Sequence, residues 1–138
     1  MKRIIMLVLL ALATINCATI QYPDGTRQRI ILPQVSSIVT VKNNCAPVID
    51  VEGSEGPIMK GVRYSTSVTV PLISDAFTGF YREMFLTITA YRRRGGGIEY
   101  LGSATKTFSV ATYSGTQRSF WIVDRLDSPY SAICQPSP

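Results

Sequence analysis

The sequence has no histidine, and this absence excludes several kinds of chemistry at once. Without an imidazole, neither a Ser-His-Asp nor a Cys-His catalytic site can be built, and a histidine-ligated zinc site is excluded as well. Cysteine is scarce too, with three in 138 residues, so a metal site built from several thiolates cannot form. We therefore expect no metal, no cofactor and no catalytic residue.

The chain also lacks a nucleotide-binding motif and an internal repeat. No glycine pattern follows a strand-like segment and opens a helix-like one, so we expect no cradle for nucleotide phosphates. The excess of basic residues is small, since 14 Lys and Arg against 9 Asp and Glu give a formal net charge of +5. That charge does not indicate nucleic acid binding by itself, and it suits a surface near anionic lipids or glycans.

The first twenty residues, MKRIIMLVLLALATINCATI, have the pattern of a secretory leader. Lys2 and Arg3 precede the apolar segment 4–13. As a helix this segment would be about 15 Å long, half the hydrocarbon core of a bilayer, so it is too short to span a membrane. We therefore expect the chain to be exported and the leader to be removed.

The end of the leader, ATINC, resembles a bacterial lipobox, the signal at which a peptidase cuts before a lipid-modified cysteine. Cys17 takes the position of the modified residue, although Thr14 and Asn16 depart from the usual pattern. The resemblance implies a lipid anchor on Cys17. With Ala18 rather than Asp after the cysteine, it also implies sorting to the outer membrane of a host with two membranes. The alternative is ordinary cleavage after Ala13, which would leave a periplasmic or secreted protein.

Past the leader, the sequence predicts an all-β domain. Apolar and polar residues alternate in SSIVTVKNN (36–44), YSTSVTVPLI (64–73) and MFLTITAY (84–91), and RSFWIVDRL (118–126) is a further strand-like run. No apolar spacing of three and four residues is sustained, which argues against helices. Roughly six or seven short strands predict a single small antiparallel β-sandwich, immunoglobulin-like or transthyretin-like.

The clearest element is a long β-hairpin within 84–110. Gly95-Gly96-Gly97 separates its two strand-like halves, and glycine readily adopts the positive φ angles of a tight reversal. Gly102, in the returning half, predicts a bulge or bend. The tip of this hairpin is therefore predicted to lie at the three glycines.

Arg92, Arg93 and Arg94 come just before these glycines. Flanked by Tyr91 and Tyr100, they are a candidate anion-binding site for a phosphate or carboxylate group. The alternative is that strand alternation directs Arg92 and Arg94 to one side and Arg93 to the other. In that arrangement they would be solubilising charges on the sheet edge.

The three cysteines predict one disulfide. An exported protein meets an oxidising compartment, in which an unpaired thiol is a liability. Acylation of Cys17 would leave Cys45 and Cys134 as a pair. Their bond would fasten the C-terminal segment beside the loop that follows the first strand of the sandwich.

These patterns divide the chain into a leader (1–16), a tether (17–36) with a candidate short strand at 29–32, a β-sandwich (37–134) and a tail (135–138). One core is expected, because the chain is too short for two domains.

We expect a non-enzymatic cell-envelope lipoprotein that serves as a structural or adaptor module for a protein partner. The second hypothesis is a binder or inhibitor of an anionic ligand, such as a lipid head group, a glycan or an acidic protein, through Arg92, Arg93 and Arg94. A small hydrolase is a third and weaker hypothesis. Its S-x-x-K match at 103–106 falls in a strand, where the serine and the lysine point to opposite sides.

Overall fold

The computed structural model of the protein describes residues 17–31, 36–54, 58–73, 81–111, 116–127 and Cys134. The leader, its Ala13 cleavage site and the tail 135–138 lie outside these residues. The part of the chain so described contains nine strands: β1 (Cys17–Gln21), β2 (Arg27–Ile31), β3 (Ser36–Asn43), β4 (Val48–Gly53), β5 (Met59–Arg63), β6 (Ser67–Ile73), β7 (Tyr81–Arg94), β8 (Gly97–Ala111) and β9 (Thr116–Val123). Within it, no helix has the length and apolar character needed to cross a membrane.

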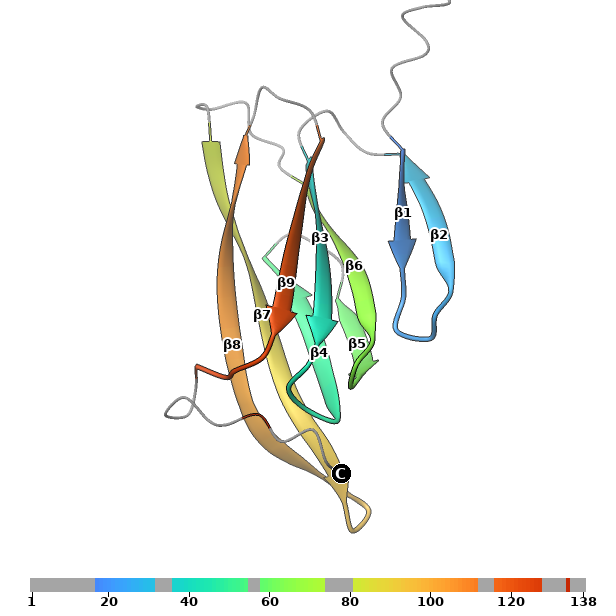
Figure 1. The fold of residues 1–138 in the computed structure, drawn as a ribbon, viewed down its shortest axis with the longest axis vertical. Helices are drawn as coiled ribbons and strands as arrows, with labels where there is room; N and C mark the ends of the chain where they lie inside the picture. Colours follow the sequence, from blue (N-terminus) through green and yellow to red (C-terminus); the bar gives the residue numbers. More distant parts are fainter. Residues whose placement is uncertain are drawn as a thin grey trace, which may run out of the picture.

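Two sheets pack against each other and form the body of the molecule (Figure 1). One has three strands in the order β6-β3-β9, and the other has four in the order β5-β4-β7-β8. The predicted all-β sandwich is therefore confirmed. One pair departs from the antiparallel prediction, because β9 runs parallel to β3. β9 lies far from β3 in the sequence. The alternation of residues within β9 does not encode whether the two strands run parallel or antiparallel.

Alternation of side chains builds the core between the sheets. In β7, Leu86 and Ile88 are fully buried, whereas Phe85 on the other face is 48% exposed. Val68 and Val70 of β6 are likewise fully buried. The predicted faces of these strands therefore point as the sequence pattern indicates.

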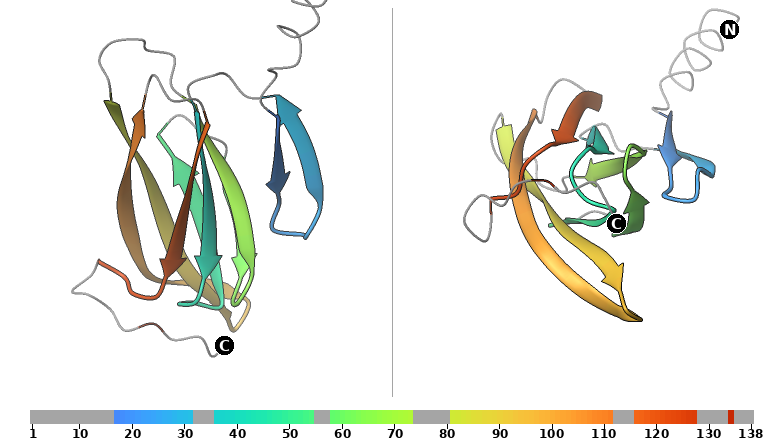
Figure 2. Two further views of the ribbon diagram at one scale, coloured as in Figure 1. Left: turned by 45° about the horizontal axis from the view of Figure 1, so that its top comes forward. Right: turned by 60° about the horizontal axis from the view of Figure 1, so that its bottom comes forward.

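The segment expected to be a tether contains a β-hairpin. β1 and β2 pair in antiparallel fashion outside the two sheets, beside β6 (Figure 2). Ala18 and Ile20 are buried in the hydrophobic core cluster, and β1 is hydrogen-bonded to β6 through the Thr69 hydroxyl, which the Gln21 N–H contacts. The Gln21 side-chain amide also donates to the Ser67 carbonyl at 3.1 Å. Residues 17–31 are thus part of the folded body.

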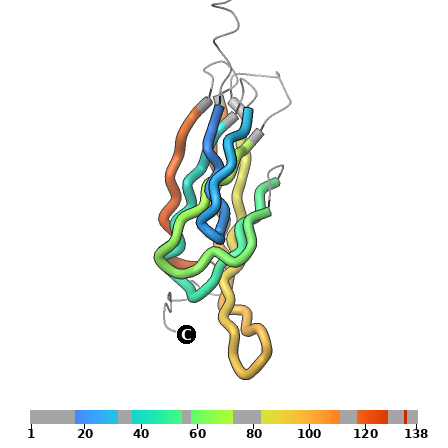
Figure 3. The backbone as a smooth tube through the Cα atoms, turned by 90° about the vertical axis from the view of Figure 1, so that its right-hand side faces the viewer, coloured from blue at the N-terminus to red at the C-terminus, as the bar shows by residue number. Residues whose placement is uncertain are grey.

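The β7–β8 hairpin is longer than its neighbours, and its tip extends past the ends of the other strands (Figures 1 and 3). Gly95 and Gly96 form the turn with φ of 57° and 80°. The pairing shifts by one residue between Ala90 and Tyr91, because Ala90 pairs with Gly102 and Tyr91 with Tyr100. This irregularity lies where the sequence predicts a bulge, and it leaves the returning strand with one extra residue.

Candidate functional site

The candidate site is the tip of the β7–β8 hairpin, where cross-strand pairing sorts the side chains onto two faces. Arg92 pairs with Glu99, Arg93 with Ile98 and Tyr91 with Tyr100. Side chains that lie directly opposite each other in an antiparallel pair share a face. One face therefore carries Arg92, Arg94 and Glu99, and the other carries Tyr91, Arg93, Ile98 and Tyr100.

Glu99 engages the arginines of the first face. Arg92 Nε lies 2.7 Å from Glu99 Oε2, and a second guanidinium nitrogen donates to Oε1 at 3.2 Å. Arg94 Nη1 lies 3.8 Å from the same Oε2. The hydrogen bond lowers the pKa of Glu99 and raises the pKa of Arg92, so both groups are charged at neutral pH. This face is therefore partly neutralised, and the three arginines do not converge on one point.

On the second face, Tyr91 is half-buried, and the other side chains are exposed to solvent. The Tyr91 hydroxyl donates to Asp50 Oδ1 at 3.1 Å, and the same oxygen accepts the Gly61 N–H at 2.8 Å. Burial and this bond to a carboxylate raise the pKa of Tyr91. These contacts fix the base of the hairpin tip against β4 and β5.

Beyond Tyr91, three side chains of the second face are exposed: Arg93, Ile98 and Tyr100. Ile98 is 73% exposed and Tyr100 is 56% exposed. We refer to Arg93, Ile98 and Tyr100 as the tip surface. It combines a cation, an aliphatic side chain and an aromatic ring on a protruding hairpin.

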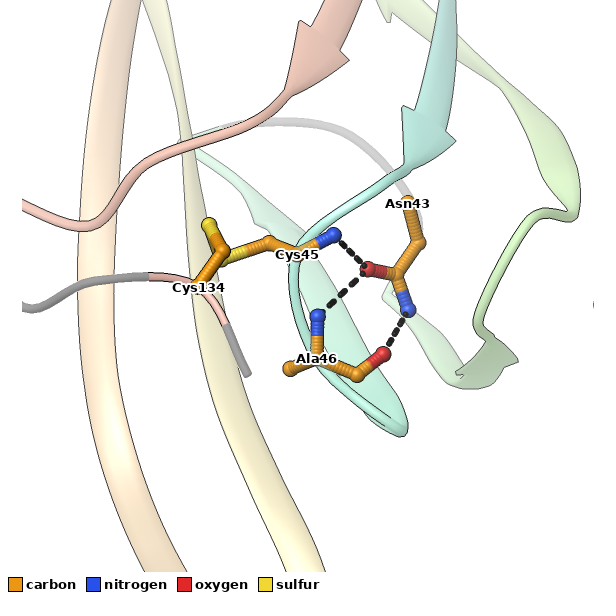
Figure 4. The surroundings of a disulfide bond; sticks show 4 residues. All are labelled: Asn43, Cys45, Ala46 and Cys134. Atoms are coloured by element: carbon orange, nitrogen blue, oxygen red, sulfur yellow. Dashed lines mark hydrogen bonds between the residues drawn. A yellow bond between two sulfur atoms is a disulfide. The ribbon is translucent and has the colours of Figure 1, made fainter. Parts of the chain in front are cut away.

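The predicted disulfide is confirmed. Cys45 and Cys134 are bonded, with their Cα atoms 4.4 Å apart across 89 residues of sequence. Cys45 is fully buried in the loop between β3 and β4. The bond therefore fastens the C-terminal segment to the body at this loop (Figure 4).

Asn43 is a structural residue that the sequence does not single out. Its buried side chain donates to the Ala46 carbonyl at 2.9 Å and accepts the N–H groups of Cys45 and Ala46, each at 3.1 Å (Figure 4). It also donates to the Val62 carbonyl at 2.9 Å. The amide thus shapes the loop that presents Cys45. The sequence shows only an Asn43-Asn44 pair at a strand end, and this pair does not reveal which asparagine is buried.

Cys17 is the first residue of β1 and is exposed, and its sulfur takes no part in the disulfide. Its cross-strand partner is Ile31, which is 72% exposed. The cysteine expected to carry a lipid is therefore accessible at the start of the folded body.

Two open hollows lie elsewhere on the surface. One of about 440 Å³ lies between β8 and the segment after β9, and Lys106, Trp121 and Asp124 contribute to its lining. The other, of about 620 Å³, lies between the β1–β2 turn and the β5–β6 turn, beside Lys60 and Arg63.

Among the residues with described positions, every buried side-chain nitrogen or oxygen has a hydrogen-bond partner, and no cluster of acidic and cysteine side chains could hold a metal.

No known protein family, no curated protein and no solved structure is similar enough to the chain to count as a match.

Proposed function

We propose that this protein is an exported, non-enzymatic module of the cell envelope that is anchored through an acyl group on Cys17. In this proposal the tip surface contacts a protein partner. The observation that carries the proposal is the exposure of Ile98 and Tyr100 beside Arg93 on a hairpin that extends beyond the rest of the fold.

Two features support export. The leader has the charge and the apolar length of a secretory signal. The Cys45–Cys134 disulfide is of a kind that persists in oxidising compartments and is rare in the cytosol. The exposed position of Cys17 at the start of β1 supports anchoring there, because an acyl chain on an exposed cysteine need not enter the core.

The chemistry of the tip surface supports a protein partner. Arginine and tyrosine are enriched among the residues that dominate binding energy at protein interfaces. Ile98 adds apolar area that stays exposed to water in the isolated protein. A partner that offers an apolar pocket and an acidic group would complement all three side chains.

A multi-arginine anion site, the second function expected from the sequence, has less support. Arg92 and Arg94 contact Glu99 on one face, and Arg93 lies on the other. A single phosphate would therefore have to displace Glu99 to engage Arg92. The geometry favours a contact that uses Arg93 together with its apolar neighbours.

A photo-crosslinking experiment tests the partner contact. A photoreactive amino acid is placed at position 98 or 100 of the full-length chain, and cells that produce the protein are irradiated. We expect one discrete crosslinked product from both positions. Arg93→Glu should weaken the product, because the reversed charge would repel an acidic partner.

The matched control for this experiment is position 107 on the exposed side of β8. Thr107 is exposed but lies away from the tip surface, so a probe there should give no such product. Equal products from positions 98 and 107, or no product from 98 and 100, would overturn the proposed contact.

A further inference from the structure

We propose that the exposed face of the β1–β2 hairpin lies on an anionic lipid bilayer and orients the anchored protein. This inference deepens the proposed function, because it assigns a membrane-facing surface to the module. It depends on residues of the β1–β2 hairpin, which lies beside β6 and away from the tip surface (Figure 1).

The register of the hairpin gathers a distinct set of side chains on one face. Cys17 pairs with Ile31, and Thr19 pairs with Arg29. The alternate residues Ala18 and Ile20 are buried, so the Cys17 face points away from the core. Arg27, two residues before Arg29 on β2, continues the same face and is exposed, whereas its cross-strand partner Gln21 is half-buried and hydrogen-bonded to Ser67 of β6. We call Cys17, Thr19, Arg27, Arg29 and Ile31 the hairpin outer face.

The charge of the hairpin outer face is positive. Neither Arg27 nor Arg29 forms an ion pair with any residue whose position is described. The nearest acidic residue in sequence is Asp24, in the turn between the strands and three residues before Arg27, with which it forms no ion pair. Its carboxylate accepts the N–H and the hydroxyl of Thr26 at 2.9 and 2.6 Å, and these bonds lower its pKa. Both arginines are therefore available to lipid phosphates.

The apolar contribution comes from Ile31. It is 72% exposed on the edge strand of a two-stranded sheet, directly opposite Cys17. Side chains paired across antiparallel strands lie about 5 Å apart, so acyl chains on Cys17 would begin beside Ile31. Peripheral membrane proteins bind a bilayer surface through exposed apolar side chains with cationic side chains next to them. Ile31 with Arg27 and Arg29 has this arrangement.

The occupant is lipid rather than protein because of where the anchor sits. A lipid on Cys17 would hold the hairpin outer face at the bilayer surface at high effective concentration, whereas a protein partner would have to compete for the same face. Each arginine near an anionic surface favours binding by about fivefold, so Arg27 and Arg29 together give a weak but measurable attraction that also orients an anchored protein.

Vesicle binding tests this inference without an acyl chain. Residues 17–138 contain every described strand and the disulfide, and they are used with Cys17→Ser. The chain is sedimented with vesicles of mixed phosphatidylglycerol and phosphatidylcholine, or of phosphatidylcholine alone. We expect measurable binding to the anionic vesicles only. Arg27→Gln with Arg29→Gln should lower the partition coefficient by about tenfold or more.

The control variant removes the same charge elsewhere. Arg93→Gln with Arg125→Gln replaces two exposed arginines outside the hairpin and should lower the partition coefficient by less than about threefold. Ile31→Ser should also weaken binding, whereas Ile98→Ser at the tip surface should not. Circular dichroism checks that each variant stays folded.

Equal losses in the two double variants would mean that binding follows net charge alone and would overturn the inference. Equal binding of the parent chain to anionic and neutral vesicles would overturn it as well. Neither outcome bears on the acyl anchor or on the tip surface, because the chain tested carries no acyl group and no partner is present.

Discussion

At the residue scale, Asn43 shows how one buried amide organises the loop that carries Cys45. Both donor hydrogens and the acceptor oxygen of its side chain are used, and all of its partners are backbone groups. A fully satisfied buried network of this kind fixes one loop conformation, because each lost bond would leave a backbone group without water or a partner.

Removing this amide should destabilise the fold more than any surface change. We expect Asn43→Ala to lower the free energy of unfolding by about 2 to 4 kcal/mol, because several buried backbone groups lose their partners. Urea denaturation measures the change. Asn44→Ala is the matched control, since Asn44 is half-buried and none of these bonds involve its side chain. A similar loss in both variants would contradict the role given to Asn43.

Because of Tyr91, the free energy of unfolding should decrease as the pH rises into the alkaline range. Its pKa is raised in the folded protein by burial and by Asp50, so the folded state disfavours the phenolate. This contribution to stability is complete below the ordinary pKa of about 10 and is lost as pH rises toward the folded value. We therefore expect Tyr91→Phe to be less stable than the parent chain at about pH 8, and the gap to narrow by about pH 11. Denaturation series at the two pH values measure this difference in stability. A difference that widens with pH would contradict a raised pKa of Tyr91 in the folded protein.

At the element scale, the β7–β8 turn depends on glycine at one position more than at its neighbour. Gly96 has φ of 80°, a conformation that side-chain-bearing residues avoid. A Cβ on Gly97 would meet only the Arg94 carbonyl oxygen at 3.6 Å, an ordinary contact.

We expect Gly96→Ala to lower the free energy of unfolding by about 1 to 2 kcal/mol and to loosen the pairing of Arg92 with Glu99. Gly97→Ala should change stability by less than about 0.5 kcal/mol. Thermal or urea unfolding of the pair separates the two positions. If both substitutions were equally tolerated, the turn would not depend on the left-handed conformation at Gly96.

The strands that the sequence predicts best are those with strict alternation. Val68 and Val70, or Leu86 and Ile88, recur at period two and are buried as that period requires. β1 and β2 are harder to predict, because each has only five residues and β2 shows mostly polar side chains. β1 contacts β6 and β2 pairs with β1, and the contacts with β6 are long-range and leave no local pattern.

At the scale of the whole molecule, the disulfide closes a loop that contains β4 to β9. Its two cysteines are 89 residues apart, so the bond restricts the unfolded chain over that whole length. In the chain-entropy description such a loop contributes about 4 to 5 kcal/mol.

Breaking this bond should therefore lower the stability of the whole domain. In a Cys17→Ser background, which prevents thiol exchange, we expect Cys134→Ser to lower the free energy of unfolding by about 4 kcal/mol. Denaturation in urea with and without reductant measures the same difference in the parent chain. A midpoint unchanged by reductant would contradict the stabilising role.

The candidate site was only partly predictable at this scale. The sequence locates Arg92, Arg93 and Arg94 at a hairpin tip and predicts their alternation. It does not predict that Glu99 engages two of them, because that contact depends on the register across the turn. The hairpin outer face could not be predicted from the sequence either, because it depends on the pairing of Cys17 with Ile31.

Metabolic labelling with palmitate, combined with intact mass analysis, tests most directly whether this protein is an exported and anchored module. We predict that the wild-type chain incorporates label, begins at Cys17 and has no free thiol at Cys45 or Cys134, whereas Cys17→Ser takes up no label. An unlabelled, full-length chain recovered with its leader intact and all three thiols free would contradict the account.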